Sequence, residues 1–463
     1  MMGGAGRCAR ARGLRQRLAE NPGEVFTGIL SREDVDELCR GLGHVWRKRV
    51  FTPLVTLWTF LTQVLSADAC CRQAVARVLG FLSATAGLRA SHDASAYCRA
   101  RKRLPAELLP RLTCTVAGKL AAGLEPKHLW HGHRVRLVDG SSVAMPDTPE
   151  NQAAYPQPKA QKPGCGFPVA RVAALFDLLT GALVDLALGA LAVGETLLFH
   201  RIWDSLEAGD VAVADRHFCS YADIALLRAR GIESVFRLHP GRVHGFREGQ
   251  YLNRNERLVR WAKHQRPAWL SPDDFEALPD TQVLRLVRFR CRVPGWRVDE
   301  VFVVTTLLDH KAYRACDIAE LFHRRWDIET DFAHLKTTMQ LEFLRTRTPD
   351  MVERELWAHL LAYNLIRSLM WEAGLRRRVS PTGLSFKAAI QEMMALWPFT
   401  AAAARRRDLT DFYDTLLHSI GFHRLPQRPH RCEPRVRKRR AKNYRLMTKP
   451  RHLYHEELQK QRS

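Results

Sequence analysis

The sequence shows no secretory-signal pattern in residues 1–20, no long apolar run and no paired-cysteine motif. Residues 1–20 are rich in Gly and Arg and lack an apolar segment, so no secretory signal is predicted. Residues 51–67 carry no charge, but their Thr, Gln and Ser side chains indicate a buried helix rather than a membrane span. The 11 cysteines include no C-x-x-C pair, which argues against a zinc site or a disulfide framework and predicts reduced thiols in the cytoplasm.

Acidic residues are also scarce. The 463 residues hold 48 Asp and Glu against 72 Lys and Arg, which gives a formal net charge of +24. With 46% apolar residues the chain can bury a large core, so a disordered basic tail protein is excluded. The length predicts about two to four domains. So large a positive charge indicates a polyanionic partner, with nucleic acid as the first candidate and an acidic membrane surface as the second.

The two ends of the chain hold most of the excess charge. Residues 424–463 contain 14 Lys and Arg and three Glu, and residues 1–19 contain five Arg and no acid. Together these ends account for 16 of the 24 net charges. The densest run, residues 435–442, is either a solvated tail or a DNA-contacting one.

A third basic stretch lies inside the chain. Residues 242–266 carry seven Lys and Arg against two Glu, with aromatic residues interleaved. Residues 287–293 then alternate strictly between apolar residues and arginines, which predicts a strand with one apolar face and one face of Arg288, Arg290 and Arg292. Pro294 and Gly295 predict a turn before a returning strand. The arginine face either is solvated or contacts phosphates.

Residues 20–125 are predicted to be helical. The sequence from Ser31 to Asp34 is typical of a capping box that opens a helix. Asp93 or Ser95 can cap a second, basic helix that stops near Pro105. This helix carries Arg99, Arg101, Lys102 and Arg103. It either enters a DNA groove or lies on the protein surface.

An α/β arrangement follows. A strand from Val135 to Asp139 is predicted to be broken by Gly140, and residues 170–177 and 182–188 predict a hairpin around Gly181. Further elements are a helix over 195–206, a buried strand over 210–215, a helix over 220–230 and a strand over 232–238. Two long helices are predicted at about 317–341 and 350–374. This order predicts a mixed sheet in an α/β fold.

Three acidic residues lie in these predicted elements at positions that are typical of functional sites. Asp139 and Asp215 each end a predicted strand, where sites in α/β sheets are built. In the helix over 317–341, a spacing of about 100° per residue puts Phe322, Arg325, Glu329 and Lys336 in one row. An apolar stripe of Leu321, Ile328, Phe332 and Leu335 lies beside that row. The row is either an ion-pair ladder on a solvated face or part of a site.

These residues resemble a known family. Phe322, Arg325, Glu329 and Lys336 are similar in spacing to the Tyr-Arg-Glu-Lys signature of bacterial DDE transposases of insertion sequence family four. The sequences at 138–141 and 214–221 resemble that family's first and second Asp motifs, and residues 145–152 are also similar. The intervals of 76 and 114 residues between the three acidic positions fit as well. The resemblance covers residues 20–450. One departure is Phe322, where the family has tyrosine.

The resemblance implies an α/β fold with a ribonuclease-H-like catalytic core, interrupted by a β-rich insertion, between a helical N-terminal domain and a helical C-terminal region. The implied parts are a DNA-binding or accessory domain (1–125), the first part of the core (126–239), the basic insertion (240–310), the second part of the core (311–375) and a C-terminal region with a basic tail (376–463). It also implies a cytoplasmic, nucleoid-associated bacterial protein.

The resemblance further implies roles for individual residues. Asp139, Asp215 and Glu329 would be the catalytic and metal-binding triad, with two Mg²⁺ ions per site, or Mn²⁺ in their place, and with Asp139 bridging both. Arg325 and Lys336 would hold DNA phosphates. Possible contacts to the DNA end come from Phe322, Arg288, Arg290 and Arg292, and base stacking from Trp261, Trp269 or Trp296. The implied partners are double-stranded transposon ends and target DNA, bridged by a homodimer in the synaptic complex.

The expected activity is cut-and-paste transposition, with binding of terminal inverted repeats, metal-dependent phosphodiester cleavage and strand transfer. Two alternatives remain open. Phe322 weakly favours a non-catalytic DNA-binding relic, against which the three intact carboxylates argue. A nuclease of the same fold would cut DNA without joining it. A membrane-surface protein is disfavoured because no strong apolar face accompanies the basic runs.

Overall fold

The computed structural model describes residues 26, 28–47, 49–88, 90–243, 245–290, 300–399, 409–426 and 446–460. The chain divides into two compact units. The first comprises residues 1–125, 179–184 and 331–425, and the second comprises residues 126–178, 185–330 and 426–463. We call them the helical unit and the sheet unit.

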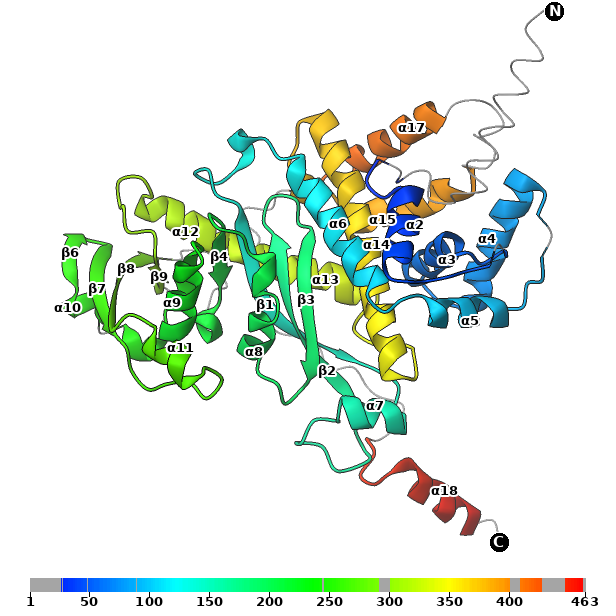
Figure 1. The fold of residues 1–463 in the computed structure, drawn as a ribbon, viewed down its shortest axis with the longest axis horizontal. Helices are drawn as coiled ribbons and strands as arrows, with labels where there is room; N and C mark the ends of the chain where they lie inside the picture. Colours follow the sequence, from blue (N-terminus) through cyan, green and yellow to red (C-terminus); the bar gives the residue numbers. More distant parts are fainter. Residues whose placement is uncertain are drawn as a thin grey trace, which may run out of the picture. The chain divides into compact units, whose positions relative to one another are not determined.

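The helical unit is built around α14 (Pro349–Arg377), which is buried along most of its length. Helices α3, α6, α15 and α17 pack against it (Figure 1). The other helices of this unit complete the bundle, whose members have the bounds α2 (Arg32–Gly41), α3 (Pro53–Leu65), α4 (Cys71–Ala86), α5 (Ser95–Arg103), α6 (Leu108–Ala122), α15 (Phe386–Leu396) and α17 (Leu409–Phe422).

The uncharged segment near residue 60 is a buried helix, as its Thr and Gln content predicted. Residues 53–64 of α3 are all buried. Within the described ranges, every helix is too short or too polar to cross a membrane. The eight described cysteines carry free thiols.

The predicted capping box at the start of α2 is confirmed. The Ser31 hydroxyl accepts the Asp34 N–H at 3.1 Å, and the Asp34 carboxylate accepts the Ser31 N–H at 2.7 Å. Lys119 of α6 lies 2.7 Å from the same carboxylate, so the cap also ties α2 to α6.

We expect Ser31→Ala to lower the free energy of unfolding by about 1 kcal/mol, because a helix N-terminal N–H loses its acceptor. Chemical denaturation of the full chain followed by circular dichroism measures the change. Ser83→Ala, at an exposed position within α4, is the matched control and should leave stability unchanged or slightly raised. Equal losses in the two variants would contradict the capping role.

The sheet unit contains a single nine-stranded mixed sheet with strand order β3-β2-β1-β4-β5-β9-β8-β7-β6 (Figure 1). The central strands β1, β4 and β5 are parallel, while β1 pairs antiparallel with β2 and β5 pairs antiparallel with β9. The strand bounds are β1 (Val135–Ala144), β2 (Val169–Asp177), β3 (Leu183–Ala190), β4 (Val211–Ala214), β5 (Glu233–Arg237), β6 (Gln250–Asn253), β7 (Glu256–Ala262), β8 (Thr281–Arg290) and β9 (Glu300–Thr305).

Short helices accompany this sheet. Helix α8 packs against β1 and β2, α9 packs against β5, and α12 packs against β5 and β8. Their bounds, with those of the remaining helices, are α7 (Pro149–Ala154), α8 (Glu195–His200), α9 (Tyr221–Ala229), α10 (Gly245–Glu248), α11 (Pro272–Glu276), α12 (Ala315–His323), α13 (Asp327–Ala333) and α18 (Arg451–Lys460). The predicted helix over 195–206 is shorter than expected, because only a 3₁₀ turn (Trp203–Ser205) follows α8.

Two further predictions need correction. Gly140 does not break β1, which continues to Ala144 because residues 140–144 pair with β2. The predicted helix over 317–341 is not regular, since a 3₁₀ turn (Arg324–Trp326) separates α12 from α13 and a π-helical turn (His334–Thr338) follows α13. Successive residues therefore do not advance by a constant 100° along this segment. The apolar stripe is nonetheless buried at Leu321, Ile328, Phe332 and Leu335.

The basic segment over 240–310 joins the core sheet. Its last strand, β9, pairs antiparallel with β5 from Val235↔Thr305 to Arg237↔Val303, and β8, β7 and β6 follow outward. A buried ion pair, with 2.6 Å between Arg285 Nη2 of β8 and a Glu256 carboxylate oxygen of β7, holds the two strands together. The strand predicted at residue 287 exists as β8, which begins at Thr281.

Candidate active site

Asp139 and Asp215 lie at the same edge of the sheet. Strands β1 and β4 are parallel, and their last paired residues are Val138 and Ala214. The two aspartates directly follow these residues. β4 ends here while β1 continues. Beside Asp139, β1 therefore has an open edge, meaning that its side toward β4 pairs with no described strand. The Gly140 N–H donates to Asp139 Oδ1 at 2.8 Å, which holds the carboxylate against that edge.

Asp215 also begins a turn. Its Oδ1 accepts the His217 N–H at 2.7 Å and lies 3.0 Å from His217 Nδ1, so the carboxylate caps the 3₁₀ turn Arg216–Phe218. Its side chain keeps 26% of its surface exposed. The capping role and a role in a site are compatible, because both hydrogen bonds use Oδ1 and the side chain is partly exposed.

Arg325 links Asp139 to Glu329. The guanidinium is 3.7 Å from Asp139 Oδ2 and 3.9 Å from Glu329 Oε1. Arg325 lies in the 3₁₀ turn that follows α12, and Glu329 lies in α13, so the irregular helix brings both to the sheet edge. The structure thus brings together two of the predicted carboxylates and the predicted phosphate-binding arginine.

Arg325 is held in an aromatic setting. Its side chain is only 7% exposed, and the guanidinium carbon lies 5.7 Å from the Phe322 ring centre and 5.2 Å from that of Trp326. No described residue accepts a hydrogen bond from the buried Arg325 Nε. Phe322 is itself buried, at 3% exposure, and packs against Phe289. Its ring therefore supports Arg325 from below the surface instead of presenting a face to DNA.

The electrostatics of the edge centre on Asp139. The pKa of Asp139 is raised to about 6, mainly by burial and to a smaller extent by the negative charges of Asp215 and Glu195, against the lowering effects of the Gly140 N–H and Arg325. The ionised form of such a buried carboxylate is stabilised by a nearby positive charge. The described residues include no group of three or more His, Cys, Asp or Glu side chains already gathered to hold a metal ion. The donors are nevertheless hard carboxylate oxygens, the type that Mg²⁺ prefers.

Lys336, the last residue of the predicted row, belongs to the helical unit. It lies in the π-helical turn, where partial burial lowers the pKa of its ammonium group. The boundary between the units falls within α13, just after Thr330. Lys336 thus stays a predicted phosphate ligand.

The directions of the strands show at which of the two edges of the sheet each remaining predicted DNA contact lies. β8 runs parallel to β5, so Arg288 and Arg290 at its C-terminal end lie at the same edge as Asp139 and Asp215. β7 runs in the opposite direction, so Trp261 near its C-terminal end lies at the other edge. Arg237, which ends β5 next to Asp215, adds a further positive charge to the carboxylate edge.

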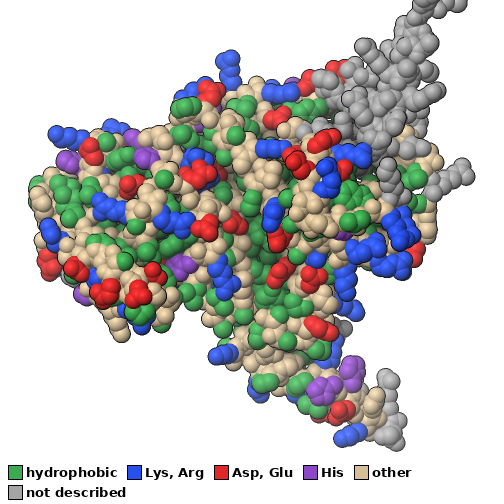
Figure 2. Space-filling model, in the orientation of Figure 1, with side chains coloured by type: hydrophobic (Ala, Val, Ile, Leu, Met, Phe, Trp, Pro, Cys, Tyr) green, Lys and Arg blue, Asp and Glu red, His purple; other side chains and the backbone are tan. Residues whose placement is uncertain are grey.

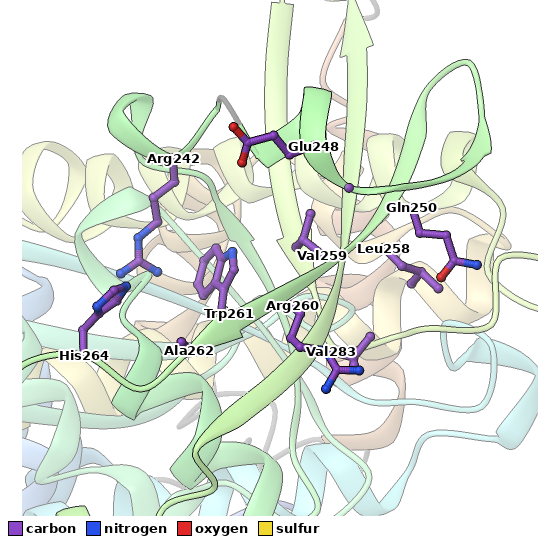
Figure 3. Close-up of a pocket in the computed structure, with 11 residues that line it drawn as sticks. Arg242, Glu248, Gln250, Leu258, Val259, Arg260, Trp261, Ala262, His264 and Val283 are labelled. Atoms are coloured by element: carbon purple, nitrogen blue, oxygen red, sulfur yellow. The ribbon is translucent and has the colours of Figure 1, made fainter.

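Trp261 lines a cavity of about 660 Å³, shown in Figure 3. The Arg242 guanidinium covers its ring at 4.2 Å, and Arg260 and His264 also line the space. Trp269 packs on His200 with ring centres 4.0 Å apart, and both tryptophans pack against the apolar cluster of α9.

The basic helix of the helical unit is α5. Lys and Arg side chains gather over it in Figure 2. Arg99, Lys102 and Arg103 are exposed, but Arg101 is buried and donates to Gln63 at 2.9 Å while its guanidinium covers the Phe60 ring. Because its guanidinium is buried and has internal partners, Arg101 is less accessible to phosphates than the other three basic residues of α5, which stay predicted DNA contacts. Arg292, Trp296 and the basic runs at 1–19 and 435–442 lie outside the described residues.

Two residues of this edge escaped sequence reasoning. Arg237 ends a strand, and the rule that was applied to aspartates at strand ends would have found it. Glu195 is the first residue of α8 and contributes to the field at Asp139. No motif or periodicity points to it, because its proximity to Asp139 arises only when α8 packs on β1.

Comparisons with known proteins show which family the chain belongs to. The family described as transposase DDE domain matches residues 130–365, just over half of the chain. The transposase InsG of insertion sequence element IS4 from Escherichia coli K12 is 28% identical over 360 residues, which cover 76% of this chain and 77% of that protein. The putative transposase InsZ of the same organism is 27% identical over 30% of this chain and 46% of its own length.

Among solved structures, a cryo-EM structure of the piggyBac transposase synaptic complex with hairpin DNA is similar over 86% of this chain and 85% of that chain. Its identity is 9% and its TM-score is 0.45.

The family match and the similarity to the InsG transposase define the class of DDE-type transposases, enzymes that act on DNA. The chain belongs to the transposase DDE domain family. The resemblance to insertion sequence family four that the signature residues indicated is confirmed by the similarity to the IS4 protein.

Proposed function

We propose that this transposase moves its own element by cut-and-paste transposition, with Asp139, Asp215 and Glu329 as its catalytic and metal-binding carboxylates. The observation that carries this proposal is the shared sheet edge, where the pairing of the parallel strands β1 and β4 ends directly before Asp139 and Asp215 and where Arg325 lies within 4 Å of both Asp139 and Glu329. No feature of the edge favours a DNA-binding relic, since all three carboxylates are present.

The strand order supports a ribonuclease-H-like core. Strands β3-β2-β1 are followed by the parallel strands β4 and β5, and the segment over 240–310 adds four strands beyond β5 before α12 returns the chain to the core. In this proposal residues 126–239 and 311–375 form the core around the insertion. Residues 1–125 form the accessory DNA-binding domain, and residues 376–463 form the C-terminal region.

Two divalent cations, Mg²⁺ or Mn²⁺, would be held by the three carboxylates and would stabilise the attacking and leaving oxygens of phosphodiester cleavage. The chain itself supplies the positioning. The Gly140 N–H orients the Asp139 carboxylate, the His217 N–H orients that of Asp215, and α13 carries Glu329 to the same edge. Arg325, whose Nε has no acceptor among the described residues, would bind a phosphate of the transposon end.

The remaining DNA contacts follow from position and charge. Arg288 and Arg290 line a cavity of about 510 Å³ together with Arg254 and Asn255, at the edge that holds the carboxylates. These arginines would follow the DNA backbone next to the cleaved bond, and Lys336 would hold a further phosphate. Trp261 remains a candidate for base stacking at the opposite sheet edge. A homodimer would bridge the two transposon ends.

The basic tail should affect affinity and not chemistry. Replacing Arg437, Lys438, Arg439 and Arg440 by Gln should weaken DNA binding and reduce the slope of log K against log salt by up to about 3.6, because each lost phosphate contact releases about 0.9 fewer counterions. Filter binding across a salt series measures the slope. Single-turnover cleavage of pre-bound DNA should stay within about twofold of wild type, and loss of that cleavage would contradict this division of roles.

The proposed function is tested first on the flanking DNA. Inverted repeats just outside the gene, bordered by a short target duplication, should be protected by the purified protein in a footprinting experiment. Specific binding to those repeats supports the transposase as the mover of that element. Equal affinity for the repeats and for scrambled DNA of the same length would contradict it.

A further inference from the structure

Glu195 lies directly on the backbone of β1 next to Asp139. A Cβ atom placed on Gly140 would fall 2.3 Å from Glu195 Cδ and 2.5 Å from Glu195 Oε2, so the carboxylate occupies the space that any other residue's side chain would need. The absence of a Cβ atom at this position therefore serves a steric purpose and not only the geometry of the strand. It lets an acidic side chain from α8 reach the strand that carries Asp139.

The first turn of α8 adjoins both aspartates. The Thr196 hydroxyl lies 3.4 Å from the His217 carbonyl oxygen, in the turn that follows Asp215. Side chains of adjacent strand residues point to opposite faces, so Glu195 approaches from the Gly140 face while Asp139 meets Arg325 on the other. The Gly140 N–H turns the Asp139 carboxylate toward the open edge of β1, and the Glu195 carboxylate lies over the same glycine.

The charge of Glu195 is only loosely compensated. Its nearest cationic partner, Arg171 Nε, lies 3.8 Å from Oε1, which is too far for a hydrogen bond. Arg171 instead donates to the Val193 carbonyl oxygen at 3.0 Å. Glu195 keeps 33% of its side chain exposed and adds a negative charge to a place where Asp139 and Asp215 already repel each other. Acidic groups are stable together when a cation lies between them.

We propose that Glu195 is a fourth carboxylate of the catalytic centre and supplies an oxygen ligand to the divalent cation held at Asp139. The inference rests on the proposed function, since it presupposes a cation at this edge. It adds a residue that lies outside the three acidic motifs and comes from a helix on the opposite face of the sheet from Glu329.

The test is Mn²⁺ binding to the full-length, DNA-free protein, measured by electron paramagnetic resonance titration of free Mn²⁺. Glu195→Gln keeps the size of the side chain and removes its charge, and it should weaken Mn²⁺ binding about tenfold. Glu207→Gln is the matched control, because this glutamate pairs with Arg134 at 2.7 Å near the opposite end of β4 and should bind Mn²⁺ as wild type does.

A purely structural role would give a different pattern. If Glu195 only pairs with Arg171, then Arg171→Gln should reduce Mn²⁺ affinity and the metal-free melting temperature as much as Glu195→Gln does, and that result would overturn the inference. Gly140→Ala provides a second variant, since its methyl group must displace the Glu195 carboxylate without removing any charge. It should weaken Mn²⁺ binding too, and it serves if Glu195→Gln fails to fold.

The two proposals fail in distinguishable ways. Wild-type Mn²⁺ affinity in Glu195→Gln, combined with a loss in Asp139→Asn and Asp215→Asn, would overturn the role of Glu195 alone. Undiminished affinity in Asp139→Asn and Asp215→Asn would overturn the metal site of the proposed function itself.

Discussion

Asp139→Asn, Asp215→Asn and Glu329→Gln should each reduce single-turnover DNA cleavage at least about 10⁴-fold, which corresponds to roughly 5.5 kcal/mol of lost transition-state stabilisation. Each substitution keeps the shape of the side chain and removes a charged oxygen ligand. DNA affinity should change by no more than about threefold, because phosphate contacts elsewhere on the chain supply most of the binding energy. Gel-based cleavage of a labelled transposon end measures the rate.

Asp204→Asn is the matched control for these variants. Its side chain is 97% exposed and pairs with Arg230 at 2.9 Å. It should cleave at the wild-type rate. Cleavage that survives any one of the three triad substitutions would remove that carboxylate from the proposed centre.

Arg325→Lys should lower cleavage about 100-fold, and Arg325→Ala about 10³-fold, while DNA affinity stays nearly constant. Lysine keeps the positive charge but lacks the planar fork of the guanidinium group. In Arg325 this fork reaches Asp139 and Glu329 and leaves Nε for a phosphate oxygen. The alanine variant also leaves the partly buried Asp139 without its cationic neighbour. The same labelled transposon end, assayed under single-turnover conditions, gives the rates.

Arg324→Lys tests whether this effect is specific. Arg324 is the preceding residue of the same 3₁₀ turn, but it pairs with Asp327 at 3.3 Å and donates to the Leu178 carbonyl oxygen. Its substitution should change cleavage by less than about threefold. Equal losses in the two lysine variants would mean that the turn as a whole, and not the Arg325 guanidinium, matters for catalysis.

The positions of Asp139 and Asp215 could be predicted because the signal is local. An apolar strand followed by an acidic residue can be read over six or seven letters, and parallel strands bring such ends to one edge. The capping box at Ser31 and the buried stripe through Ile328 were predictable for the same reason. Each depends on a short periodic pattern.

The features that were not predicted correctly depend on pairing and packing with residues that are distant in the sequence. Gly140 seemed to end a strand, but the pairing with β2 extends β1, and the glycine instead makes room for Glu195. Phe322 and Arg101 are residues of types that are common on DNA-binding surfaces, yet both side chains are buried. The attachment of β9 to β5 joins strands some 70 residues apart (Val235↔Thr305), and no local pattern specifies which strand a β-rich segment will meet.

We propose that this edge of carboxylates both cuts and joins DNA. The most direct test is a strand-transfer assay with purified protein, a labelled DNA carrying the flanking inverted repeat, a target plasmid and Mg²⁺. The wild-type protein should release the repeat with a free 3′ hydroxyl and join it to the target, and Asp215→Asn should yield neither product. DNA that is bound but uncut in both Mg²⁺ and Mn²⁺, or cut but never joined, would contradict the account.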